Sequence, residues 1–326
     1  MIVITGAAGF IGSNFVAALN QRGITQIAIS DFFGTGDKWR NLGKSAFVEM
    51  IPPAMLLDWL RSRSDVEAVI HMAAISATTV ADGDLVIDTN FRLSVAILDH
   101  CAAAGVPLMF ASSASVYGHG DAGFDDETAP SHVLGLRPLN LYGWSKRQFD
   151  FVVADRIARG TGLPPACIGL RFFNVFGPNE YHKQGMKSLV AKIAGSVSRG
   201  EGITLFKSHR AGVADGDQRR DFIYVKDAVA ASMALLDSRQ TGIFNIGTGV
   251  ARSFRELAEA TFAAFKLPSK IEYVDMPEDL RAKYQYFTEA KTARLREAGY
   301  DTPFASLEDS VADYIQGYIA TDDPYR

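Results

Sequence analysis

The fold is set near the start of the chain by Ile2-Val3-Ile4-Thr5-Gly6-Ala7-Ala8-Gly9-Phe10-Ile11-Gly12. The first four residues predict a buried strand, and three regularly spaced glycines follow it directly. Gly6 permits a tight turn, Gly9 lets the backbone approach a pyrophosphate, and Gly12 lets the next helix pack against the strand. The N-terminus of that helix then faces the phosphate charge. This pattern predicts a dinucleotide-binding unit.

The second predicted strand ends at Asp31, 19 residues after Gly12. An acidic residue at this position suits a ribose hydroxyl. A carboxylate alone favours NAD, because it repels the 2′-phosphate of NADP. Lys38 and Arg40 follow in the adjacent loop, where a cation can neutralise that phosphate. These residues by themselves leave NAD and NADP open, and a solvated basic loop is the simple alternative.

Short apolar runs alternate with helix-length segments through the first half of the chain. Strands are predicted at Ile2–Thr5, Gln26–Asp31, Val66–Met72 and Pro107–Ser112, and helices at Ile11–Gln21, Ala54–Ser62, Leu85–Ala104 and Tyr142–Arg159. Near-continuous apolar strands are typical of a parallel sheet that helices cover on both faces. The expected fold is therefore α/β, a Rossmann-type doubly wound parallel sheet that binds ligands beyond the carboxyl ends of its strands.

The pattern loosens after about residue 173, where loops lengthen and predicted strands become short (204–206, 221–225 and 243–246). Capping boxes at Ser253–Glu256 and Ser306–Asp309 predict the starts of two late helices. We expect residues 1–172 to form a dinucleotide-binding Rossmann domain, which the resemblance given below makes NADP-binding. Residues 173–326 should form mainly a smaller, mixed α/β substrate-binding lobe, with some segments returning to the core sheet.

The composition excludes several classes of protein. The 326 residues include 33 basic and 37 acidic side chains, so no basic excess exists for a general nucleic-acid footprint. A hydrophobic share of 48% excludes wholesale disorder. Cys101 and Cys167 are too few for a disulfide framework or a structural zinc site. We expect a cytoplasmic protein with free thiols, without a targeting segment, a membrane span or a metal.

A second constellation of polar residues is Tyr142-Gly143-Trp144-Ser145-Lys146. Residues four apart share one face of a helix, so the Tyr142 phenol and the Lys146 ammonium should enter one site. The lysine and a nicotinium charge would both stabilise phenolate, so we expect them to lower the pKa of Tyr142 toward that of a general base. Upstream, Ser112-Ser113-Ala114-Ser115 ends a core strand, where a hydroxyl can hydrogen-bond the reacting oxygen.

These segments resemble the extended short-chain dehydrogenase/reductase superfamily. The resemblance rests on Gly6–Gly12, Ala111–Gly118 and Tyr142–Lys146, and Arg171–Pro178 and Arg220–Asp227 are similar to segments of its sugar-nucleotide epimerases and dehydratases. By matching position, the resemblance implies that Ser113, Tyr142 and Lys146 bind and oxidise the sugar.

A narrower set of segments resembles the ADP-L-glycero-D-manno-heptose 6-epimerases. These segments are Gly9–Asn14, Gly23–Thr25, Ala77–Thr79, His182–Lys183, Gly242–Gly249, Tyr284–Thr288 and Ala298–Phe304, which together extend over almost the whole chain. The resemblance implies inversion of carbon 6 in an ADP-linked heptose through a transient 6-keto intermediate, as a step toward lipopolysaccharide core precursor. It also implies NADP, in preference to NAD, bound throughout turnover, and a homo-oligomer.

The same resemblance implies residue roles. Lys38 would meet the 2′-phosphate, Lys146 would orient the nicotinamide ribose, and Lys183 would act opposite Tyr142. Cofactor contacts are expected at Gly6, Gly9, Phe10, Ile11, Gly12, Asp31, Phe32, Lys38, Met72, Ala73, Ala74, Ser76, Asn90, Tyr142 and Lys146. Substrate contacts are expected at Ser113, Asn174, Lys183, Lys192, Phe206, Arg220 and Tyr284. An arginine fork can bind a diphosphate bidentately.

Two segments depart from the family pattern on the substrate side. His209–Arg219 is longer than the usual loop, and Gln184-Gly185 stands where the family has Gly-Ser. Two alternatives therefore stay open: another sugar-nucleotide enzyme, such as a UDP-hexose 4-epimerase or a dehydratase, and a catalytically silent NADP-binding regulatory protein. A dehydratase would carry an acidic residue near the tyrosine, which the Ala-Ser after Ser113 does not supply. The intact set of Ser113, Tyr142 and Lys146 argues against a silent protein.

Overall fold

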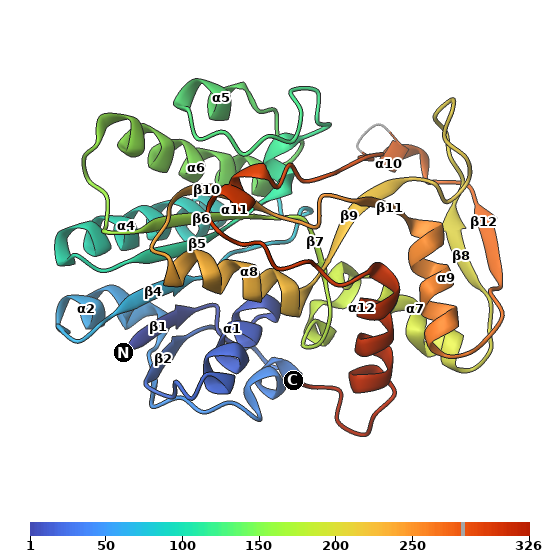
Figure 1. Ribbon diagram of the computed structural model, residues 1–326, viewed down its shortest axis with the longest axis horizontal. Coiled ribbons are helices and arrows are strands. Elements are labelled where there is room, and N and C mark those ends of the chain that lie inside the picture. The colour runs from blue at the N-terminus through green and yellow to red at the C-terminus, as the bar shows by residue number, and fades with distance from the viewer. Residues whose placement is uncertain (282–283) are drawn as a thin grey trace.

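A computed structural model describes residues 1–281 and 284–326. Its core is a seven-stranded parallel sheet in the order β10-β6-β5-β4-β1-β2-β3 (Figure 1). The strands are β1 (Ile2–Thr5), β2 (Ile27–Ser30), β3 (Glu49–Met50), β4 (Ala68–His71), β5 (Leu108–Ser113), β6 (Cys167–Phe172) and β10 (Thr241–Ile246). The strand order reverses between β1 and β4, where an open parallel sheet leaves a crevice for a ligand. The predicted doubly wound fold is confirmed.

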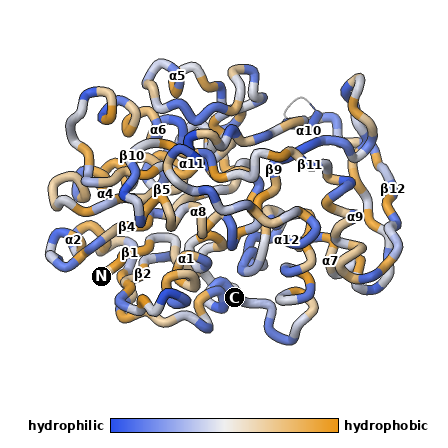
Figure 2. Tube along the Cα trace, viewed as in Figure 1, coloured by the Kyte–Doolittle hydropathy of each residue, from blue (hydrophilic) through white to orange (hydrophobic). Residues whose placement is uncertain are grey.

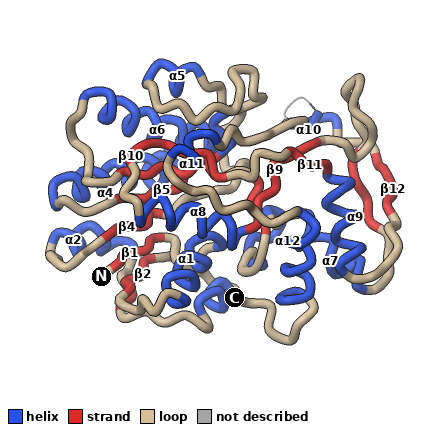
Figure 3. The backbone as a smooth tube through the Cα atoms, viewed as in Figure 1, coloured by secondary structure: helices blue, strands red, loops and turns tan. Residues whose placement is uncertain are grey.

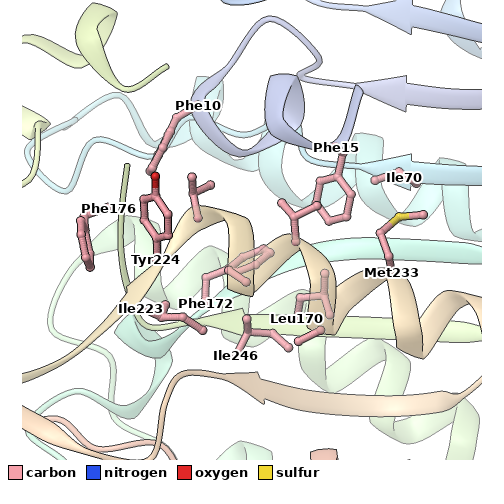
Figure 4. Close-up of a cluster of buried hydrophobic side chains, with 14 of the residues drawn as sticks. Phe10, Phe15, Ile70, Leu170, Phe172, Phe176, Ile223, Tyr224, Met233 and Ile246 are labelled. Carbon is pink, nitrogen blue, oxygen red and sulfur yellow. The ribbon is translucent and has the colours of Figure 1, made fainter. Parts of the chain in front are cut away.

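Helices cover both faces of this sheet. The helices on one face are α1 (Phe10–Gln21) and α8 (Val225–Asp237), and those on the other are α2 (Leu56–Arg61), α4 (Leu93–Ala104) and α6 (Leu141–Arg159). Figure 4 shows Phe15 of α1 and Met233 of α8 close to Ile70 and Leu170 of the sheet. Apolar residues concentrate along these strands and the packed helix faces (Figure 2). Burial on both faces explains why the sequence of each central strand is nearly all apolar.

The segment Leu85–Ala104, expected as one helix, is divided in the structure. It comprises α3 (Gly83–Ile87), a π-helical turn at Asp88–Arg92 and then α4. The π turn carries Asn90, whose buried amide accepts from the Ile75 N–H (2.8 Å) and donates to the Ile75 carbonyl (3.0 Å). Such a bulge often marks a functional position, and here it fixes the loop after β4.

Most of the remaining elements form a smaller lobe at the end of the molecule away from the N-terminus, and Figure 3 shows its strands in red. One small sheet has the order β11-β9-β7 and another pairs β12 with β8. Their strands are β7 (Asn174–Phe176), β8 (Ile203–Phe206), β9 (Arg219–Tyr224), β11 (Ala251–Ser253) and β12 (Ile271–Val274). The helices of this lobe are α7 (Leu189–Ser198), α9 (Phe254–Ala264), α10 (Glu278–Arg281) and α12 (Leu307–Tyr314). Two further helices lie against the core instead: α5 (Pro130–Gly135) packs on α6, and α11 (Ala293–Glu297) packs on β10. Within the described parts of the chain, no helix combines the length and apolar character needed to cross a bilayer.

The two predicted capping boxes have different outcomes. At the start of α9, the Ser253 hydroxyl accepts from the Glu256 N–H (3.0 Å) and the Glu256 carboxylate accepts from the Ser253 N–H (2.6 Å). At α12 the prediction of a full box is wrong. Ser306 caps the Asp309 N–H (3.0 Å), but the Asp309 carboxylate accepts from the Ser306 hydroxyl instead (2.6 Å). Aspartate is one methylene shorter than the glutamate of a capping box.

A buried ion pair joins α6 to the central sheet. Arg171 on β6 and Asp150 on α6 are fully buried, with 2.8 Å between Nε and Oδ2. Arg171 also donates to the Tyr117 hydroxyl (3.0 Å), which donates to Asn245 on β10 (2.7 Å). Burial raises the pKa of Asp150, whereas the adjacent Arg171 opposes this rise. The network therefore depends on both charges being present.

Replacing Arg171 with methionine should lower the free energy of unfolding by about 3–5 kcal/mol, because Asp150 then stays buried without its cation. Urea denaturation followed by circular dichroism measures this change, and Arg171→Met/Asp150→Leu should recover most of it. The exposed pair Arg199–Glu201 provides the control, since Arg199→Met should cost at most about 1 kcal/mol. If Arg171→Met and Arg199→Met lowered the free energy of unfolding equally, the buried pair would have no special role in stability.

Candidate active site

A cavity of about 1030 Å³ lies at the carboxyl ends of the central strands. Thr5, Ser30, Met72 and Ser113 line it from the ends of β1, β2, β4 and β5, and residues of the smaller lobe complete the wall. This is the position at which a doubly wound sheet binds its ligand. The volume is at the upper end of the range for small-molecule sites, so it suits more than a single small metabolite.

The glycine turn forms one end of this cavity. Gly6 has φ +66°, and a Cβ there would lie 2.6 Å from the Ala73 nitrogen. A Cβ on Gly12 would lie 2.1 Å from the Gly6 carbonyl oxygen, so only glycine lets α1 start this close to the turn. The N-cap of α1 is Gly9, with no side-chain cap and no acidic residue in the first turn. The free N–H groups of that turn fit the diphosphate of a dinucleotide.

Asp31 and Lys38 form an ion pair beside the glycine turn. The Asp31 carboxylate accepts from the Ala8 N–H (2.8 Å) and lies 2.6 Å from the Lys38 ammonium. Lys38 also donates to the Phe32 carbonyl (2.8 Å). Arg40, the other basic residue of this loop, stacks on the Tyr325 ring at 4.8 Å. Lys38 is thus the cation of the pair that lines the cavity.

Ser113, Tyr142 and Lys146 lie together on one wall of the cavity, as the sequence predicts. Tyr142 and Lys146 are one turn apart on α6, whose N-cap Asn140 accepts from the Gly143 N–H (2.9 Å). The buried Lys146 ammonium donates to the Ala111 carbonyl (2.9 Å). This bond holds the lysine against the end of β5.

Burial dominates the electrostatics of this wall. It raises the pKa of Tyr142, and a hydrogen bond with Ser113 opposes the rise only in part. In the chain by itself the pKa of Tyr142 is therefore raised, since desolvation of the phenolate is the largest effect. The expected lowering also depends on the charge of a nicotinium and stays a prediction. Burial also lowers the pKa of Lys146 to about 8, although the charge of Asp150 favours the ammonium.

Lys183 lies on another wall, in the 3₁₀-helical segment Tyr181–Met186. Its ammonium is 5.0 Å from the centre of the Phe10 ring at the start of α1. Burial lowers the pKa of Lys183; the charge of Glu180 opposes this shift, and that of Lys192 adds to it. The next residue, Gln184, has φ 47°, a left-handed value that favours glycine. Glutamine in place of the family's glycine at this position therefore strains the backbone.

Most other predicted contacts also line the cavity: Phe10, Ile11, Phe32, Met72, Ala73, Ala74, Ser76, Asn174, Lys192, Phe206 and Tyr284. Two predicted residues lie behind the wall instead. Asn90 bonds to Ile75, which lines the cavity. The Arg220 guanidinium lies 5.4 Å from the centre of the Tyr284 ring and 5.8 Å from that of Phe254. Burial lowers the pKa of Arg220 to about 10.

Sequence reasoning missed several residues that organise the site. Asp150 could have been found, because it lies one further turn along the face of α6 that carries Tyr142 and Lys146. The contact of Asn41 with His182 could not have been found in this way, since the two residues are far apart in the sequence. In the parts of the chain that the structure describes, no three His, Cys, Asp or Glu residues cluster to hold a metal ion.

The sequence matches known proteins along its full length. Residues 2–247 match the model of the NAD dependent epimerase/dehydratase family. The chain is 43% identical to an ADP-L-glycero-D-manno-heptose-6-epimerase of Fusobacterium nucleatum over 335 aligned positions, which cover 100% of both proteins. It is also 43% identical to the protein of the same name from Nitratidesulfovibrio vulgaris, again over 100% of both.

Solved structures show the same relationship. The crystal structure of Helicobacter pylori ADP-L-glycero-D-manno-heptose-6-epimerase superimposes with a TM-score of 0.80, at 26% identity and coverage of 97% of this chain and 95% of that one. A Thermus thermophilus UDP-glucose 4-epimerase in complex with NAD gives a TM-score of 0.75, at 26% identity and 97% coverage of both. The chain therefore belongs to the NAD dependent epimerase/dehydratase family, where it groups with the ADP-L-glycero-D-manno-heptose-6-epimerases.

Proposed function

We propose that this epimerase inverts carbon 6 of ADP-D-glycero-D-manno-heptose, giving the L-glycero epimer through a transient 6-keto intermediate. The observation that carries the proposal is the 43% identity to full-length enzymes of that name. A cavity that joins the glycine turn to Tyr142 and Lys183 supports it. Residues 1–172 would hold NADP, and residues 173–326 would mainly hold the sugar nucleotide.

NADP would lie across the carboxyl ends of the strands, with its diphosphate at the start of α1 and its 2′-phosphate beside Lys38. Lys38 neutralises Asp31, the acidic group that would otherwise repel this phosphate. The chemistry that a bound nicotinamide dinucleotide supplies here is reversible hydride transfer at carbon 6. Oxidation of carbon 6 and its later reduction then cancel, so the bound cofactor need not be replaced by another from solution.

Two groups of the chain would move protons at the sugar. Tyr142 or Lys183 takes the proton from the carbon 6 hydroxyl as the carbonyl forms, and the other returns a proton after the keto group has turned. Because burial raises the pKa of Tyr142, its use as a base depends on positive charge nearby. Lys146 provides one such charge on the same helix face. Ser113 would hydrogen-bond the reacting oxygen.

Substrate identity is tested by incubating the purified protein with ADP-D-glycero-D-manno-heptose and with UDP-glucose in separate reactions. NMR resolves the epimers in each case. The proposal predicts that only the heptose epimerises, to a mixture of the two carbon 6 forms. Turnover of UDP-glucose alone would show that the chain is a different sugar-nucleotide epimerase, and binding of NADP without any turnover would favour a silent regulatory protein.

Tyr142→Phe should reduce the epimerisation rate by about 10²–10⁴-fold, the usual effect of losing one general acid/base group. Phenylalanine keeps the packing of the ring, so the variant should fold and bind NADP as the wild type does. Fluorescence titration of NADPH checks binding, and NMR measures the rate. A rate within about threefold of the wild type would remove Tyr142 from the mechanism.

Lys38→Ala should weaken NADP binding far more than NAD binding. The variant loses the cation for the 2′-phosphate and also leaves Asp31 unneutralised. A charge-assisted contact is worth about 1.5–3 kcal/mol, which corresponds to a loss of about ten- to a hundredfold in affinity for NADP. Parallel titrations with NADPH and NADH measure the difference. If both cofactors weaken equally, Lys38 does not read the phosphate.

Lys183→Met should fold and bind NADP but lose epimerisation in both directions, because one proton-transfer group is missing. Lys183→Arg separates charge from proton transfer, since a guanidinium stays protonated at neutral pH and cannot act as a base. It should be as inactive as the methionine variant. Activity is followed by NMR from each epimer in turn. A fully active arginine variant would leave only an electrostatic role for Lys183, and a fully active methionine variant would exclude any role.

A further inference from the structure

The segment Tyr181–Met186 is tied to the dinucleotide end of the cavity by a buried side-chain amide. Asn41 lies in the 3₁₀ segment Asp37–Leu42, which also carries Lys38, and it is 1% exposed. Its Nδ2 donates to the Ala8 carbonyl of the glycine turn (2.8 Å) and lies 3.1 Å from Nδ1 of His182. An amide NH₂ group is only a donor, so His182 Nδ1 must accept this bond.

A second buried amide reinforces the same connection. Asn179 donates from Nδ2 to the Ser13 hydroxyl of α1 (3.0 Å) and to the backbone carbonyl of Asn41 (3.3 Å). Asn14 of α1 in turn donates to the Pro178 carbonyl (3.0 Å). Residues 178–179, which lead into the segment, are thus fixed to α1. Asn41 bonds to Asn179 through its backbone carbonyl and to His182 through its side chain. These bonds join the glycine turn, the Lys38 loop and the Lys183 segment into one unit.

The protonation state of His182 suits this arrangement. Burial lowers the pKa of His182 to about 4, and the charges of Lys38 and Lys183 act in the same direction. A hydrogen bond that the imidazole donates to the Asn179 backbone and the charge of Asp31 act in the opposite direction, but less strongly. A group with a lowered pKa is neutral above that value, so His182 can accept from Asn41 throughout the neutral range.

His182 also lines the cavity directly before Lys183. A dinucleotide held by the glycine turn and Lys38 therefore occupies a site whose wall is fastened by the bond between Asn41 and His182. We infer that Asn41 and His182 are positioning residues that keep the Lys183 segment closed on the bound dinucleotide, so that the cofactor is retained between turnovers. This inference rests on the proposed placement of the dinucleotide.

The test measures cofactor release without any sugar nucleotide. Protein loaded with NADPH is mixed with a large excess of NADP, and the loss of bound NADPH fluorescence gives the dissociation rate. Asn41→Ala should raise this rate by about tenfold, because hydrogen bonds to two partners are lost. The control is Asn20→Ala. Asn20, in the last turn of α1, also donates two amide hydrogen bonds, to the carbonyls of Ile24 and Ala46 (both 2.9 Å), but lies outside the cavity wall. It should release NADPH at the wild-type rate.

Substitutions of His182 separate this role from general stability. His182→Phe keeps a ring but removes the acceptor, so it should release NADPH as fast as Asn41→Ala. His182→Asn places an amide oxygen near the position of Nδ1 and should restore slow release. Wild-type release rates in Asn41→Ala and His182→Phe would overturn the inference, as would equally fast release from His182→Asn and His182→Phe. Because no heptose is used, failure of the proposed epimerase activity would leave these rates unchanged and would be seen separately.

Discussion

The close approach of α1 to the glycine turn is the constraint on which the site depends. No side chain fits between Gly12 and the Gly6 carbonyl, where a Cβ would lie at 2.1 Å. This packing leaves the N–H groups of the first turn of α1 free for a ligand and places Ala8 between two partners. Its N–H donates to Asp31 and its carbonyl accepts from Asn41. One short turn therefore fixes the three features that the proposed function assigns to the diphosphate, the ribose and the link to the substrate side.

Burial of charge is the second physical theme of the site. It acts in opposite directions on acids and bases, raising the pKa of Tyr142 and lowering those of Lys146 and Lys183. Each shift favours the neutral form. A neutral Lys183 amine can accept a proton from a sugar hydroxyl, whereas a neutral Tyr142 phenol can only donate one and needs nearby positive charge to act as a base. The ammonium of Lys146 is partly protected by the charge of Asp150. The buried pair of Asp150 and Arg171 thus connects the stability of the fold to the chemistry of the cavity.

Patterns that are local in sequence predicted much of the fold and the cavity wall. The apolar runs located β1, β2, β4 and β5, and the glycine turn and the spacing of Tyr142 from Lys146 located two walls of the cavity. Other features depend on tertiary contacts. Sequence patterns did not predict β6. This strand contains Arg171, a charged residue that is unexpected in a buried strand unless a partner such as Asp150 is known to lie beside it. The bond of Asn41 to His182 joins residues that no periodicity relates, and the direction of the Tyr142 pKa shift follows from burial, which spacing does not report.

The central claim is that carbon 6 is inverted by oxidation and reduction at that same carbon. The most direct measurement uses ADP-D-glycero-D-manno-heptose that carries deuterium at carbon 6, incubated with the protein in ordinary water. The product is isolated, and NMR and mass spectrometry determine where the label lies. The account predicts that deuterium stays at carbon 6 of the L-glycero product, because it is removed and returned within one closed cavity. Replacement of the deuterium by solvent hydrogen would contradict the account, since it would mean that carbon 6 loses a proton instead.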